Sequence, residues 1–126
     1  MELSKVLAHF LPAGIVIQYF LGGLLAAGLI GRVGITIVEW HIVWGTILGL
    51  ISLILLILVR RKRLPQASRA AGITVVMLLV TVSLGFATFP SSGVLIRPYL
   101  AIFHQVLAAV IFGTATLTAY MTRRGI

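Results

Sequence analysis

Two histidines are the residues of this chain whose type and spacing best suit chemistry. His41 and His104 each stand near the start of a long apolar run, sixty-three positions apart in a chain of 126 residues. A polar side chain inside a membrane is costly to bury and usually has a function. Neutral imidazole is also the commonest protein ligand for metal ions. The pair is therefore the first candidate for a functional site.

The same offset of sixty-three residues relates other short motifs in the chain. It relates these pairs: Leu21-Gly22 with Leu84-Gly85, and Arg60-Arg61 with Arg123-Arg124. Each half has a Leu-Gly pair, a histidine nineteen residues after that glycine, and a double arginine that begins nineteen residues after the histidine. We interpret the chain as one domain, residues 1–126, made of two internal repeats, 1–63 and 64–126.

The composition indicates a membrane protein. Hydrophobic residues make up 60% of the chain and charged residues 10%, and the mean hydropathy is +1.18. Soluble domains have about 25% charged residues. The net charge of +8 lies in short basic clusters at the ends of apolar runs, a pattern of membrane anchoring rather than nucleic-acid binding. With no cysteine, the chain has no disulfide, no thiolate metal site and no covalent haem attachment.

The apolar runs predict an all-α membrane protein, a bundle of four transmembrane helices. Each run is about the 20 residues that a membrane crossing needs. Pro90 to Gly93 form a clear turn signal before the last run, and a proline suits the first turn of a helix. The expected helices cover about Leu7–Ile30, Val38–Val59, Ala70–Phe89 and Pro98–Tyr120.

The basic residues predict the orientation of these helices. Eight of them, Lys5, the five between Arg60 and Arg69, and Arg123-Arg124, fall on one side of the membrane. Only Arg32 and Arg97 fall on the other side. Because positively charged loops stay inside, we expect an integral protein of the cell membrane with both termini in the cytoplasm. The repeats are then parallel, related by a pseudo-two-fold axis along the membrane normal.

This arrangement places the two histidines at one depth near the outer face. His41 is the fourth residue of its expected helix and His104 the seventh, so they lie roughly 5 and 9 Å deep. Two-fold symmetry sets them facing each other across the axis. His9 starts from the cytoplasmic end and is too far away to join them.

Two facing imidazoles predict the axial ligands of one haem b, held between the second and fourth helices. Zinc and copper sites usually have three or four ligands, and Glu39 is the one further candidate ligand at this depth. Either histidine alone is equally consistent with a hydrogen bond between helices. Gln18 is expected to form such an interhelical hydrogen bond. Small residues expected to leave room for the haem ring are Gly22, Gly45, Gly85 and Ala108.

Two arginines at the outer boundary are candidates for binding the haem propionates. Arg32 and Arg97 have planar guanidinium groups, which pair well with carboxylates. Without a haem, both arginines are expected to be simple anchors at the membrane interface.

Several segments resemble one four-helix half of the haem A synthase family. They are Ile17–Leu24, the glutamate shortly before His41, and Leu84–Thr88 followed by a proline turn and His104. The resemblance implies a four-helix bundle with a haem between histidines of the second and fourth helices, here His41 and His104. It also implies a functional glutamate, here Glu39, and two such halves per enzyme, one for a haem cofactor and one for the haem that is oxidised.

The chain departs from that family pattern in four ways. It has one half only, and it lacks the outer-loop cysteine pair of many members. Ile42 stands where the family usually has an arginine, and Glu39 precedes His41 by two residues, about 200° around the helix.

We therefore expect a membrane b-type cytochrome that transfers single electrons, with a quinol or an outer-face electron carrier as its partner. Two protein ligands on the iron leave no open position for oxygen, which favours electron transfer. One alternative is an enzyme, a half-size haem A synthase or related oxidoreductase that acts as a homo-oligomer with Glu39 as its catalytic residue. Another alternative is a non-haem bundle, such as a transporter fragment or an assembly factor.

Overall fold

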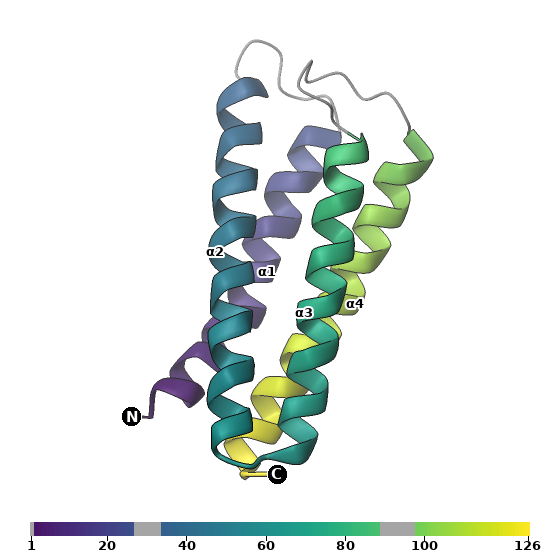
Figure 1. Cartoon of the computed structure of the whole chain (residues 1–126). Helices are drawn as coiled ribbons and strands as arrows, with labels where there is room; N and C mark the ends of the chain where they lie inside the picture. Colours follow the sequence, from purple (N-terminus) through teal and green to yellow (C-terminus); the bar gives the residue numbers. More distant parts are fainter. Residues whose placement is uncertain (1, 27–33, 89–97) are drawn as a thin grey trace.

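The computed structural model of the chain describes residues 2–26, 34–88 and 98–126, and all of its regular elements are α-helices. Each helix is long and apolar enough to cross a membrane, as the sequence predicted. In chain order the four helices are α1 (Leu3–Ala26), α2 (Gly34–Arg61), α3 (Pro65–Thr88) and α4 (Pro98–Arg124) (Figure 1).

The helices extend further at one end of the bundle than hydropathy predicted. α1 begins at Leu3 rather than Leu7, and α3 begins at Pro65 rather than Ala70. α2 and α4 continue through their double arginines instead of ending before them. Hydropathy marks only the segment inside hydrocarbon, whereas a helix continues into the polar interface, where long basic side chains reach water. α2 also begins earlier than expected, at Gly34.

Each helix packs against its neighbours to form a closed ring. α1 contacts α2, α2 contacts α3, α3 contacts α4, and α4 returns to α1. Successive helices run in opposite directions, and both chain termini lie at the same end of the bundle (Figure 1). As a result, α2 and α4 stand diagonally opposite each other, with the bundle interior between them.

The connection between α2 and α3 is a tight helix cap. Arg63 adopts a left-handed conformation with φ of 55°, the amide of Leu64 donates to the carbonyl of Val59, and the amide of Arg63 donates to that of Arg60. These two bonds define the Schellman motif, which satisfies carbonyl groups left free at a helix end. The turn therefore reverses the chain within three residues.

Large apolar side chains cover the outside of the bundle as well as its interior. Phe20, Leu79 and Ile102 are each more than 60% exposed, whereas Leu11, Leu48 and Ile111 are buried. An apolar exterior is unfavourable in water and suits contact with lipid. Hydrogen bonds also join the helices. One runs from the indole Nε1 of Trp44 on α2 to the carbonyl oxygen of Gly14 on α1, at 2.8 Å.

Candidate functional site

The structure brings His41 and His104 together across the interior of the bundle. Their ring centroids lie 6.0 Å apart, and the ring planes are inclined by 47°. His41 is the eighth residue of α2 and His104 the seventh of α4, about 10 and 9 Å from their helix starts. Both histidines thus lie about two turns from the starts of their helices, at the same end of the bundle.

The imidazole of His104 has a defined tautomer. Its Nδ1 lies 2.9 Å from the carbonyl oxygen of Thr81 on α3. A carbonyl oxygen can only accept, so the neutral ring donates its Nδ1 proton and leaves Nε2 with a free lone pair. Metal-binding histidines commonly have this arrangement, in which the second nitrogen donates to a carbonyl or a carboxylate. Nε2 is therefore the nitrogen of His104 that can accept a hydrogen bond or serve as a ligand atom.

Glycines on α1 and α3 let the two histidine rings pack directly against helix backbone. A Cβ added at Gly22 would lie 3.1 Å from Cε1 of His41. A Cβ added at Gly85 would lie 3.2 Å from Cε1 of His104. Both distances are shorter than ordinary carbon contacts, so any side chain at these positions would push on the ring. Each glycine thus fixes the position of one imidazole.

Gln18 of α1 lies on the turn of α2 that carries His41. Its Nε2 donates to the carbonyl oxygen of His41 at 2.9 Å, the interhelical bond expected from the sequence. A Cβ at Gly45 would lie 3.0 Å from the same Nε2. Gly45 therefore makes room for the Gln18 amide in this structure, whereas the sequence suggested that it makes room for a ring.

Two buried atoms beside this contact have no hydrogen-bond partner among the residues that the structure describes. They are Oε1 of Gln18 and Nδ1 of His41. Unpaired buried polar atoms are unusual, and each calls for a physical explanation. His41 and His104 thus differ, because only His104 has a partner for its Nδ1.

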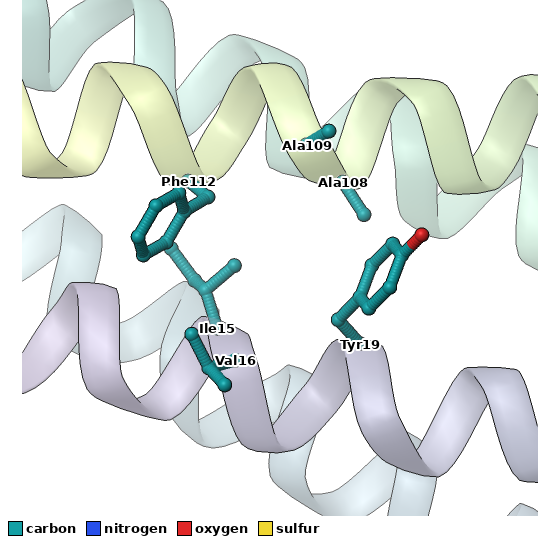
Figure 2. Close-up of a pocket in the computed structure, with 6 residues that line it drawn as sticks. All are labelled: Ile15, Val16, Tyr19, Ala108, Ala109 and Phe112. Atoms are coloured by element: carbon teal, nitrogen blue, oxygen red, sulfur yellow. The ribbon is translucent and has the colours of Figure 1, made fainter.

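Ala108 lies one turn along α4 from His104 and lines a groove of about 200 Å³ between α1 and α4. Figure 2 shows its side chain beside the ring of Tyr19, with Phe112 of α4 further along the groove. The remaining lining residues are Ile15, Val16 and Ala109. The side chain of Ala108 therefore faces the groove between α1 and α4.

Other candidate residues lie apart from the histidine pair or outside the described segments. His9 is exposed in the second turn of α1, with its Nδ1 2.6 Å from the carbonyl oxygen of Lys5. Glu39 is exposed on α2. Arg32 and Arg97 lie outside the described residues, so their predicted contacts with propionates stay predictions.

The site offers two nitrogen ligands. Within residues 2–26, 34–88 and 98–126, no three His, Cys, Asp or Glu side chains gather where they could hold a metal ion. A metal–imidazole bond is about 2 Å long and the ring centre lies about 1 Å behind the nitrogen, so two imidazoles on opposite sides of one metal have centroids about 6 Å apart. The observed centroid separation of 6.0 Å equals this distance.

Comparison with known proteins gives no match. No protein-family model, curated protein or solved structure is similar to this chain at a significant level.

Proposed function

We propose that this protein is a membrane cytochrome in which His41 and His104 are the axial ligands of one haem b. The observation that carries the proposal is the 6.0 Å separation of the two imidazole centroids, which suits one metal between two rings. The 2.9 Å contact between His104 Nδ1 and the Thr81 carbonyl oxygen supports it, since it frees Nε2 for a metal.

The proposed activity is transfer of single electrons. A haem held at this site would supply one-electron redox chemistry, and His41 and His104 would be its two protein ligands. The chain contributes the rest of the site. His41 and His104 would hold the haem from opposite helices, and Gly22 and Gly85 leave room for their rings beside the helix backbone. The electron donor proposed for this site is a quinol in the bilayer or a carrier at the outer face.

The two halves of the bundle support a finer description of the fold as two parallel repeats. An offset of sixty-three residues relates Gly22 to Gly85 and His41 to His104. A Cβ built on each glycine would lie at nearly the same distance from the histidine Cε1, 3.1 Å for Gly22 and 3.2 Å for Gly85. Each half therefore supplies one histidine and one glycine, as expected for a symmetric cofactor site between repeats.

In the proposed orientation the protein lies in the cell membrane and both of its termini lie in the cytoplasm. Both termini lie at one end of the bundle (Figure 1), and the ends of α2 and α4 there carry double arginines. Positively charged segments stay inside, so this end is cytoplasmic and the histidine pair lies toward the outer face. Arg32 and Arg97 are then the proposed partners of the haem propionates.

A half-size haem A synthase, acting as an oligomer, is the second candidate function. It is favoured by the resemblance of Ile17–Leu24 and Leu84–Thr88 to that family, and it assigns catalysis to Glu39. Glu39 is exposed on α2, which favours the cytochrome. Expression beside a source of haem O separates the two, because only a synthase converts that pigment to haem A. A non-haem bundle is the third candidate.

The proposed ligands are tested by alanine variants of the three histidines. We expect His41→Ala and His104→Ala each to abolish or convert the low-spin haem spectrum of the purified protein. His9→Ala is the control, and its spectrum should equal that of the wild type because His9 is remote from the pair. An unchanged spectrum in the His104 variant would rule out this ligand assignment.

A further inference from the structure

The two unpartnered buried atoms near His41 belong to residues that already touch. Oε1 of Gln18 and Nδ1 of His41 are both inaccessible to solvent and have no partner among the described residues. The other amide atom of Gln18, Nε2, donates to the backbone carbonyl of His41 at 2.9 Å. One atom is an acceptor and the other becomes a donor once it carries the ring proton, so they are chemically complementary.

The local packing keeps Gln18 beside the imidazole of His41. Gly45, one turn after His41, leaves space for the amide, since a Cβ there would approach Nε2 to 3.0 Å. Gly22 lies one turn after Gln18 on α1, and its Cβ position is 3.7 Å from Nδ1 of His41. The backbone of α1 around Gln18 and Gly22 therefore runs alongside the nitrogen that lacks a partner.

Metal binding would require an acceptor at this place. A neutral histidine that binds iron through Nε2 carries its proton on Nδ1, and that proton is normally held by a hydrogen bond. His104 has the carbonyl oxygen of Thr81 for this purpose. Residue 18 corresponds to residue 81 at the sixty-three-residue offset. The residue at this position therefore lies next to the histidine in each half. In the second half its backbone carbonyl, that of Thr81, is the acceptor.

We propose that Gln18 is a positioning residue for the haem. Its Oε1 accepts a hydrogen bond from the Nδ1–H group of His41 when His41 binds iron through Nε2. This inference rests on the proposed function. The bond fixes the tautomer and the orientation of the His41 ring and increases the electron density on its nitrogen ligand. A more electron-rich ligand stabilises ferric iron, so the bond lowers the midpoint potential of the haem.

Two substitutions separate the roles of the two amide atoms. Gln18→Met keeps the length of the side chain and removes both the Nε2 amino group and the Oε1 oxygen of the amide. Gln18→Glu keeps an oxygen that can accept from Nδ1, and when ionised it has no hydrogen to donate to the His41 carbonyl. Thr81→Val is the matched control, because the partner of His104 is the Thr81 backbone, which this change retains.

Haem titration and redox titration of the purified variants test the proposal. We expect Gln18→Met to bind haem b about ten to a hundred times more weakly, as is usual when a partner of a metal ligand is lost, and to have a raised midpoint potential. Gln18→Glu should recover most of the affinity and have a potential below those of Gln18→Met and of the wild type, because an ionised carboxylate is a stronger acceptor than an amide oxygen. Thr81→Val should match the wild type in both measurements.

Each other outcome overturns the inference in a recognisable way. If Gln18→Met matches the wild type, the acceptor role is wrong while the cytochrome stands. If Gln18→Met and Gln18→Glu lose affinity equally, only the Nε2 bond to the His41 backbone matters. If Gln18→Met fails to fold by circular dichroism, the Gln18→Glu variant decides, and a potential equal to the wild type or above it contradicts the role. If the wild type binds no haem, both this inference and the proposed function fail.

Discussion

Gly22 offers a sharp test of the packing that positions His41. In Gly22→Ala, the new methyl group would lie 3.1 Å from Cε1 of the ring, whereas ordinary contacts begin at 3.4 Å, so the imidazole must move by about 0.3 Å. Overpacking of a well-packed site costs about 1–3 kcal/mol. The overlap is only a few tenths of an ångström, so the lower value of about 1 kcal/mol applies.

The neighbouring glycine provides a matched control for this prediction. A Cβ at Gly23 has no atom within 4 Å among the described residues, so Gly23→Ala should leave the site undisturbed. About 1 kcal/mol corresponds to roughly fivefold weaker binding, so we expect Gly22→Ala to lose about that much haem affinity. Gly23→Ala should retain wild-type affinity and gain up to about 1 kcal/mol of helix stability.

The assay is a spectroscopic titration of each detergent-solubilised variant with haem b, beside thermal unfolding of the haem-free protein. The two readouts separate an effect on the site from an effect on the fold. Equal affinities for Gly22→Ala and the wild type, or an equal loss in Gly23→Ala, would refute the conclusion that Gly22 sets the position of the His41 ring.

Three further predictions concern other parts of the chain. Arg63→Gly should raise the unfolding free energy by about 1 kcal/mol in thermal melts, since glycine adopts a left-handed conformation without the steric cost that Arg63 bears. The 2.8 Å hydrogen bond from Lys62 holds the pKa of the Glu2 carboxyl below its ordinary value. This ion pair therefore makes a small, salt-sensitive contribution to stability at pH values above the ordinary carboxyl range, and the contribution is lost as the pH falls through the lowered pKa. The difference between the thermal melts of wild type and Lys62→Ala should therefore shrink at low pH to the part that comes from the hydrogen bond of Lys62 to Ser4. Glu39→Gln should retain the haem and raise its midpoint potential only slightly, because Glu39 faces outward from the bundle, about 200° around α2 from His41, and a redox titration that finds the haem lost would contradict this.

The membrane-spanning helices could be predicted from the sequence because hydropathy over about 20 residues is a strong signal. Their ends could not, since the basic ends of α2 and α4 are polar yet helical, and hydropathy does not distinguish a helix in the interface from a loop. Pro65 illustrates the same point, because a proline that marks a loop in sequence is also favoured in the first turn of a helix, where α3 has it.

The histidine pair could be found because its residue type is rare at membrane depth and the offset repeats. The partner of His104 could not, because the acceptor is the backbone carbonyl of Thr81 and every residue has such a group. The contact of Gln18 with the His41 turn depends on how α1 packs against α2. The neighbour of Gly45 could not be predicted either. Helical spacing shows which face of α2 this glycine lies on but not which side chain fills the space beside it, so it was expected to make room for a haem ring.

The central claim is that His41 and His104 occupy both axial positions of one haem iron, and carbon monoxide tests it most directly. The purified wild-type protein, loaded with haem b, should have a low-spin absorption spectrum and a low-spin ferric electron paramagnetic resonance signal. After reduction, its spectrum should not change on addition of carbon monoxide, because two imidazoles 6.0 Å apart leave the iron no free position. A protein that takes up no haem, or a ferrous spectrum that shifts at once with carbon monoxide, would contradict the claim.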